Sequence, residues 1–259
     1  MWAKGYNFYL YLSGTAEYDS ARYNGTWSRD PESFGRPSAI AVPKTAQQVY
    51  AAVQFCMATG SKFSVACGRH TPSSIKQGVL MIDLTSEMNS VVVDPAAKTV
   101  TVGGGAKIGA VDAACKPHKY IIPLGRVGST GCAGQMLCTG AHGYIERKLG
   151  LGLDFMIRAT VVLTTGIVQC SETENPDLFW GIRGGQTNFG ILTEMVFRGE
   201  EAPSDGQYYC SQRVYLPVGM LGMASRQGIL DYLIQKMDCS AVHDYNISAT
   251  LLGKDLSDC

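Results

Sequence analysis

The sequence predicts an α+β fold, and three observations lead to this prediction. A strand, a helix and a second strand follow one another between residues 39 and 66. Short apolar strands then recur from residue 78 to residue 198, and glycine-rich turns separate them. The chain of 259 residues is 46% hydrophobic, which is enough to bury the core of one large domain or of two modest ones. This order of elements indicates sheets that are covered by helices.

The strand–helix–strand unit is the clearest pattern near the N-terminus. The segment AIAVP, residues 39–43, is a short apolar strand. The helix follows Thr45, carries apolar residues at helical spacing and is expected to end at Gly60. The segment KFSVA, residues 62–66, is the second strand. Residues 1–35, which are rich in Tyr, Ser, Gly and Asn, are expected to form an irregular N-terminal extension.

Strands dominate the chain from residue 78 to residue 198. Asp94-Pro95 is expected to form a turn, and Asn175 is expected to cap a helix with Pro176 at its first position. The expected elements in order are a strand at 78–84, a strand at 98–105, a helix at 107–115, a glycine-spaced segment at 123–152, a hairpin at 158–170 with its turn near Thr165-Gly166, a helix starting at 176, and a strand at 189–198.

The residues after Arg198 are expected to begin another unit. The polar segment 199–207 is typical of a linker. A strand at 208–216 and a helix at 224–237 follow it, and the remaining residues barely develop this unit.

Composition excludes several functional classes. The formal net charge of zero argues against a nucleic-acid-binding protein, which is usually basic. No apolar run approaches the roughly 20 residues of a membrane span. The N-terminus lacks an apolar segment with a small-residue cleavage site, which favours a cytoplasmic location, although sequons at Asn24 and Asn246 leave secretion open. The nine cysteines show neither a CxxC pair nor zinc spacing, so no metal site is predicted and buried free thiols are favoured.

Glycine spacing indicates a ligand, although the common nucleotide motifs are missing. Gly103, Gly105 and Gly109 fail the dinucleotide pattern because Ile108 occupies the third glycine position, and no GxxxxGK[ST] loop occurs. A second segment could need its glycines only for positive φ angles. Close approach of the backbone to a phosphate or a flat ring explains their density better. These glycines are Gly125, Gly128, Gly131, Gly134, Gly140 and Gly143.

A third glycine-bearing turn precedes the last strong strand. Arg183-Gly184-Gly185 and Asn188-Phe189-Gly190 combine glycines with polar groups before the buried segment that starts at Ile191. Phe179 and Trp180, just ahead of them, are expected to pack in the core.

The order of these segments resembles the flavin-binding domain of the FAD-linked oxidases, the vanillyl-alcohol oxidase family, and most closely its berberine-bridge-enzyme-like branch. The resemblance covers residues 36–198. The segments that carry it are RPSAIAVPKTAQQVYAAVQFCMATG, FSVACGRHTPSS in place of the family's V-R-G-G-G-H-S loop, VLMIDLTSEMNSVVVDPAAKTVTVGGGAKIGAV, GQMLCTGAHGYIERKLGLGLD and NPDLFWGIRGGQTNFGILTEMVF.

The resemblance implies a PCMH-type FAD-binding domain made of two α/β subdomains. This domain would span residues 36–199, with its subdomains at 36–92 and 93–199. Residues 200–259 would then begin a partial substrate domain, or cap, that is shorter than in the family. The catalytic base of the family lies in the part that this chain lacks, so no catalytic residue is assigned.

The resemblance also implies a role for His70, which falls on the histidine that the family bonds to the 8α methyl of its flavin. The alternative is an ordinary loop histidine. Gly128 falls on the position of the cysteine of doubly tethered members, so one covalent link, through His70 only, is expected. The residues expected to hold FAD are Cys67, Gly68, Arg69, His70, Thr71, Gly125, Gly128, Gly131, Gly134, Gly140, Gly143, Asn188, Gly190 and Ile191.

The sequence departs from the family's triple glycine at Cys67-Gly68-Arg69. Arg69 could contact phosphate oxygens, or it could block the close approach that glycine allows.

The implied function is an FAD-dependent oxidoreductase that oxidises a small-molecule substrate such as a sugar, an alcohol or a secondary metabolite, with dioxygen as acceptor. The alternatives are a flavin-binding remnant without turnover and a non-flavin interaction domain.

Overall fold

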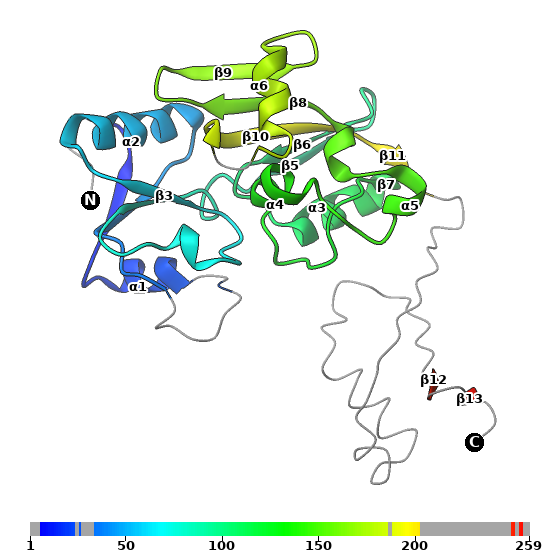
Figure 1. Cartoon of the computed structure of the whole chain (residues 1–259), viewed down its shortest axis with the longest axis horizontal. Coiled ribbons are helices and arrows are strands. Elements are labelled where there is room, and N and C mark those ends of the chain that lie inside the picture. The colour runs from blue at the N-terminus through cyan, green and yellow to red at the C-terminus, as the bar shows by residue number, and fades with distance from the viewer. Residues whose placement is uncertain are drawn as a thin grey trace. The chain divides into compact units, whose positions relative to one another are not determined.

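The computed structural model describes residues 6–23, 26, 34–185, 188–202, 250–251 and 254–255. Within them two main sheets follow one another along the chain (Figure 1). The expected strand at 208–216 and the expected helix at 224–237 lie outside the described residues. By its internal contacts the chain divides into two units, Met1–Ala202 and Pro203–Cys259. In the second unit, strands β12 (Thr250–Leu251) and β13 (Lys254–Asp255) pair antiparallel.

The first sheet has the strand order β1-β2-β4-β3. Its strands β2 (Ala39–Val42), β3 (Phe63–Ala66) and β4 (Leu80–Asp83) confirm the sequence prediction, and β4 pairs parallel with both others. Parallel strands need a crossover, and helix α2 (Ala46–Thr59) supplies it between β2 and β3.

The ends of α2 also agree with the prediction. The Thr45 hydroxyl accepts a hydrogen bond from the amide of Gln48 at 3.3 Å, as a helix N-cap does. Gly60 ends the helix in the left-handed conformation with φ of 66°. The buried face of α2 carries Val49, Ala52 and Val53, as the helical spacing predicts.

The prediction that residues 1–35 are irregular was wrong for two segments. Strand β1 (Tyr9–Leu12) pairs antiparallel with β2, and helix α1 (Ala16–Tyr23) follows it. Tyr18 of α1 is fully buried, and its hydroxyl donates to the carbonyl of Pro37 at 2.6 Å. The segment lacks a long apolar run, so only its tertiary contacts reveal that it completes the first sheet.

The second sheet is antiparallel and has the order β5-β6-β10-β8-β9. The hairpin of β8 and β9 confirms the predicted turn, since the amide of Leu163 donates to the carbonyl of Gly166 at 2.8 Å. The strands are β5 (Val91–Asp94), β6 (Thr99–Gly103), β8 (Met156–Val162), β9 (Ile167–Ser171) and β10 (Ile191–Arg198). A separate short pair joins β7 (Tyr120–Ile121) to β11 (Glu200–Glu201), so the start of the predicted linker forms a strand.

The helices of this half confirm two expectations and add two elements. Helices α3 (Ile108–Cys115) and α6 (Pro176–Ile182) lie where the sequence predicts them. Helices α4 (Cys132–Thr139) and α5 (Glu146–Leu149) form in the glycine-spaced segment, for which no helix was expected. Short 3-10 helices occur at Pro72–Ser74, Lys116–His118 and Gly152–Phe155.

One expectation about α6 is confirmed in position, and another was wrong. Asn175 lies at the N-cap position and Pro176 at the first helical position, although the Asn175 side chain donates to the carbonyl of Gln169 at 2.8 Å and makes no capping hydrogen bond. Phe179 is buried, whereas Trp180 is 80% exposed. Adjacent helix positions point about 100° apart, so only one of the two aromatic side chains faces the sheet.

The core explains why the two sheets hold together. The larger cluster lies between the second sheet and helices α3, α4 and α6. A second cluster combines α2 and the first sheet with Val162 and Ile191 of the second sheet. In addition, the Gln54 side chain of α2 donates to the carbonyl of Thr164 at 2.8 Å. Helix α2 therefore packs on both sheets. In the described part of the chain no helix is long and apolar enough to cross a membrane.

Candidate functional site

The loop after β3 and the loop before α4 lie in direct backbone contact. A Cβ atom placed on Gly68 would overlap the backbone nitrogen of Gly131. One placed on Gly131 would overlap the Cys67 sulfur and come within 2.5 Å of the amide nitrogen of Gly68. Only glycine permits this approach at both positions. Two predicted ligand-binding segments, far apart in the sequence, are thereby brought together.

A third segment, residues 106–109 at the entry to α3, forms hydrogen bonds with the loop before α4. The amide of Ile108 donates to the carbonyl of Thr130 at 3.0 Å, and the amide of Gly109 donates to the carbonyl of Gly128 at 2.9 Å. The amide of Cys132 in turn donates to the carbonyl of Ala106 at 2.9 Å. The loop of residues 128–131 is therefore fixed by the entry to α3, and Gly109 belongs to the site although it fails the dinucleotide pattern.

His70 lies at the junction of the two loops, and its residue is half-buried. Its Nε2 is 3.2 Å from the Ser129 hydroxyl, and its Nδ1 is 3.4 Å from the Thr130 hydroxyl. Burial lowers the pKa of the imidazole below its usual value, and the charge of Lys107 lowers it further, while a hydrogen bond that the ring donates to the backbone of Ser129 opposes the shift. The ring is therefore mainly neutral at pH 7, which leaves one nitrogen able to act as a nucleophile.

Arg69 does not reach outward from this loop. Its side chain is buried, and Nη2 lies 2.7 Å from the Asp83 carboxylate, which is also fully buried. Its Nη1 donates to the Thr85 hydroxyl at 3.3 Å. The suggestion that the guanidinium contacts phosphate oxygens was therefore wrong, because the group is used inside the domain. The alternative that Arg69 blocks a ligand is also wrong for the side chain, which points into the protein.

The Cys67 side chain fills space in the loop, and its thiol is not reactive. Burial raises the pKa of its thiol to about 12, and the sulfur lies 3.6 Å from the carbonyl of Ala106. Burial likewise holds the pKa of Cys132 well above its usual value. A thiolate is the reactive form of cysteine, so neither side chain is activated for attack. The described cysteines carry free thiols, and most are buried, as expected from the sequence.

The remaining glycines of the second segment have different roles. Gly125 packs against the Gln135 side chain, and Gly143 packs against the carbonyl of Leu124. Gly140 ends α4 with φ of 69°. Gly134 lies on the exposed face of α4 with open space where its Cβ would be. Packing and backbone conformation therefore account for three of these glycines, and a ligand-contact role is left to those near His70 and to Gly134.

The third cluster of predicted residues has other neighbours. The Asn188 side chain donates to the carbonyl of Gly185 at 3.0 Å. Gly190 has φ of 152°, and a Cβ there would lie 2.7 Å from a methyl of Val161. Ile191 belongs to the core cluster around α2. Their described contacts place these residues at the start of β10 and not at His70.

The sequence reasoning missed Ser129, Thr130 and Lys107. The two hydroxyl residues lie between Gly128 and Gly131, and that position was the only available signal for them. Lys107 precedes α3, and the backbones of Lys107 and Gly131 form an isolated β-bridge. A positive charge this near to His70 suits an anionic or electron-rich ligand.

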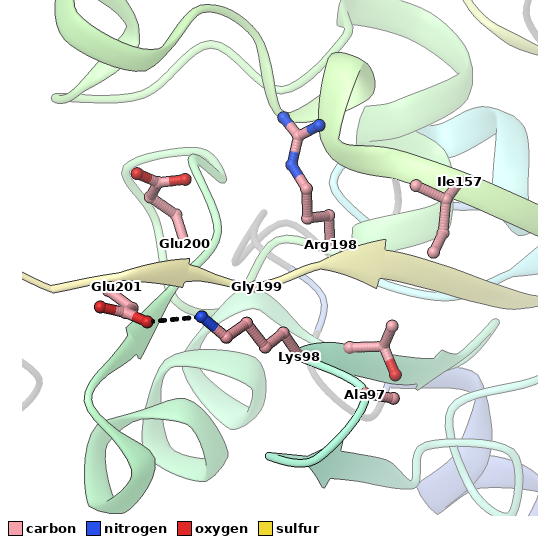
Figure 2. A pocket seen from close by; sticks show the side chains of 8 residues that line it. Ala97, Lys98, Ile157, Arg198, Gly199, Glu200 and Glu201 are labelled. Carbon is pink, nitrogen blue, oxygen red and sulfur yellow. Dashed lines mark hydrogen bonds and ion pairs between the residues drawn. The ribbon is translucent and has the colours of Figure 1, made fainter.

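Two hollows on the described surface lie elsewhere. The larger, of about 510 Å³, is lined by residues at the ends of β6 and β10, and Figure 2 shows Lys98 reaching Glu201 across it at 2.8 Å. The other, of about 360 Å³, lies beside α1. Neither includes a residue of the predicted ligand site. In the described part of the chain no group of three or more His, Cys, Asp or Glu residues could hold a metal ion.

Comparisons with known proteins agree with this geometry. A family described as "FAD binding domain" matches residues 37–171. The chitooligosaccharide oxidase of Gibberella zeae is 38% identical over 200 residues, which cover 73% of this chain and 40% of the relative. The (R)-6-hydroxynicotine oxidase of Paenarthrobacter nicotinovorans is 33% identical over 177 residues, which cover 67% of this chain and 38% of the relative.

Solved structures share the fold. The 6-hydroxy-D-nicotine oxidase of Arthrobacter nicotinovorans matches with a TM-score of 0.71 and 29% identity, over 78% of this chain and 44% of that structure. The glucooligosaccharide oxidase of Acremonium strictum, described with a 6-S-cysteinyl, 8α-N1-histidyl FAD, matches with a TM-score of 0.68 and 32% identity, over 76% of this chain and 41% of that structure.

Two sheets bridged by α2, together with paired glycine loops around a histidine, define a PCMH-type flavin-binding domain. The chain belongs to the FAD-linked oxidase family, among the berberine-bridge-enzyme-like proteins. It spans about 40% of the length of the curated relatives given above. The domain limits at residues 36, 92 and 199 stay predictions.

Proposed function

We propose that this chain is the FAD-binding part of a flavin-dependent oxidoreductase in which His70 is covalently attached to the flavin. The observation that carries the proposal is the position of His70 between two glycine loops that touch through Gly68 and Gly131. The half-buried ring contacts both hydroxyls of the second loop. A neutral imidazole held in this way suits attachment to a ligand better than an ordinary loop role.

The residues present fit a flavin nucleotide. Gly68, Thr71 and Gly128 would offer backbone to the cofactor, and Gly134 leaves the face of α4 open for a flat ring. Lys107 would supply positive charge near His70, where burial and this charge already lower the pKa of the imidazole. We assign Gly125, Gly140 and Gly143 to shaping the loop, and Asn188, Gly190 and Ile191 to a more distant part of the cofactor.

The flavin, when bound, would accept a hydride from a C–H bond of the substrate and pass electrons to dioxygen. The part of the protein seen here binds and orients the cofactor. Attachment of His70 would break one N–H and one methyl C–H bond, form the N–C bond, and deliver two protons and two electrons to dioxygen. Ser129 and Thr130, which contact the two ring nitrogens, would fix the orientation of the imidazole, and one of these contacts would be released on attachment.

We propose a single covalent link. Gly128, on the position of the second tether in doubly linked members, has no side chain, and Cys132 is a buried thiol whose pKa is raised well above its usual value.

We propose a sugar or another alcohol as the substrate class, because chito-, xylo- and glucooligosaccharide oxidases are among the similar proteins.

Acid precipitation tests the proposal. The purified chain is denatured in acid, and flavin fluorescence is measured in the pellet for the wild type and for His70→Ala. We expect fluorescence in the wild-type pellet and none in that of the variant. Flavin that washes out in acid would contradict the covalent role of His70. Folded protein without any flavin would favour an interaction domain, and a flavin that stays oxidised with every sugar and alcohol tried would favour a remnant.

A further inference from the structure

The residue before His70 ties the loop to the interior of the first sheet. Arg69 extends from the loop after β3 to Asp83, the last residue of β4, with 2.7 Å between Nη2 and the carboxylate. Neither side chain is exposed to solvent. Removing such a pair from water is costly, so its presence needs a compensating role.

The backbone of Arg69 is itself unusual. Its φ is 51°, in the left-handed region that residues with a side chain seldom occupy. The resemblance to the FAD-linked oxidases aligns a glycine with this position, and glycine adopts such an angle without strain. An arginine here therefore needs side-chain contacts that hold the conformation, and the ion pair supplies them.

A network of hydrogen bonds extends this anchor to both sides of Gly68. The Thr85 hydroxyl accepts from Arg69 and donates to the carbonyl of Cys67 at 2.6 Å. The Asp83 carboxylate also accepts from the amide of Thr85 at 2.9 Å and from the hydroxyl of Ser86 at 2.7 Å. The network fixes the loop at residues 67 and 69, directly before residue 70.

His70 receives its position from this anchor on one side and from the second loop on the other. Its ring nitrogens contact the hydroxyls of Ser129 and Thr130 within 3.4 Å. A change of the φ angle at Arg69 would move the whole imidazole, because rotation there swings everything that follows. Reactions between held groups are sensitive to displacements of about 1 Å.

We propose that Arg69 and Asp83 form a positioning pair that holds His70 against the loop of residues 128–130 and thereby sets the rate of flavin attachment. The inference rests on the proposed role of His70. Neither residue touches the reacting atoms, so both act through the backbone of the loop.

The test compares attachment rates in the full chain. Protein prepared from flavin-starved cells is mixed with FAD, and acid-stable flavin is measured over time, with total bound flavin as a second readout. Arg69→Met combined with Asp83→Asn removes the pair without leaving a lone buried charge, and it keeps a residue with a side chain at the left-handed φ angle. We expect this variant to bind FAD but to attach it about tenfold more slowly or worse, and Arg69→Lys to restore part of the rate.

The chain offers a matched control. Lys44 and Glu87 form an exposed ion pair at 3.6 Å, and Glu87 follows Asp83 closely in the sequence. Lys44→Gln with Glu87→Gln should attach FAD at the wild-type rate. A wild-type rate in folded Arg69→Met/Asp83→Asn would overturn the proposal. If that variant does not fold, Arg69→Met with Asp83→Leu, which fills the space with apolar groups, replaces it with the same expectation.

A spectroscopic readout separates this inference from the proposed function. The NMR signals of the His70 ring, assigned by comparison with His70→Ala, should shift in the variant that lacks the pair and stay unchanged in the control. If even the wild type forms no acid-stable flavin, the proposed role of His70 fails, and the ring signals still decide the positioning. Identical ring signals in the wild type and in the variant without the pair would refute the positioning role of Arg69 and Asp83.

Discussion

At the scale of single residues, the environment of His70 predicts an unusual pH dependence. The pKa of the imidazole is lowered by burial and by Lys107. A histidine whose folded pKa is depressed contributes stability that is present above its unfolded pKa and is lost as the pH falls through the folded value. The lowered pKa also keeps the folded imidazole in its neutral, nucleophilic form to a lower pH. We therefore expect flavin attachment to keep its full rate at pH values where a histidine in an unfolded peptide is already protonated.

An NMR titration of the His70 ring measures this directly. The midpoint should lie below that of a histidine in a short peptide, and the attachment rate should follow the same curve. A midpoint above the peptide value would show that the imidazolium is the stable form in the folded protein.

The buried pair of Arg69 and Asp83 predicts a marked difference between single and double variants. Arg69→Met alone leaves a buried carboxylate without its cation, which should lower the free energy of unfolding by about 3–5 kcal/mol. Arg69→Met with Asp83→Leu removes both charges and should lower the free energy of unfolding much less. Urea unfolding monitored by circular dichroism gives both values, and equal losses would contradict a coupled pair.

At the scale of elements, the surroundings of two glycines predict that the same glycine-to-alanine substitution lowers stability at one position and raises it at the other. Gly68→Ala would place a methyl group on the backbone of Gly131 and should destabilise the protein by about 1–3 kcal/mol or more. Gly134→Ala fills open space on α4 and should stabilise the protein by about 0.5–1 kcal/mol. Thermal unfolding of the two variants tests the pair of expectations, and destabilisation by both would mean that α4 is crowded at Gly134.

The helices and strands differ in how far the local sequence revealed them. Helix α2 was predictable to the residue because Thr45, its apolar spacing and Gly60 all act locally. Helix α4 was hidden, because Gly131 and Gly134 belong to a segment whose glycines suggested a loop. Strand β1 was hidden because its pairing with β2 crosses a gap in the sequence that no local pattern reports.

At the scale of the whole molecule, the cluster that α2 shares with both sheets predicts cooperative unfolding of residues 6–202. Ile191 of β10 is buried in this cluster together with Val53 and Ile82. Ile191→Ala should cost about 2–5 kcal/mol, as large-to-small core substitutions do. Amide hydrogen exchange should show β4 and β8 losing protection together in this variant.

A control comes from the exposed edge strand β5. Val92 is 60% exposed, so Val92→Ala should change stability by less than about 0.5 kcal/mol. If Ile191→Ala weakened protection in the second sheet alone, the two sheets would unfold as separate units.

The sequence by itself determined the family of this protein, most of its strands and the place of His70 in a glycine-bearing loop. These features are encoded in apolar periodicity, turn residues and motif order, all of which are read along the chain. Only the tertiary structure decided that Arg69 turns inward to Asp83, that Trp180 is exposed and that Ser129 and Thr130 meet His70. These outcomes depend on which distant segments become neighbours, and the spacing of residues along the chain does not fix that.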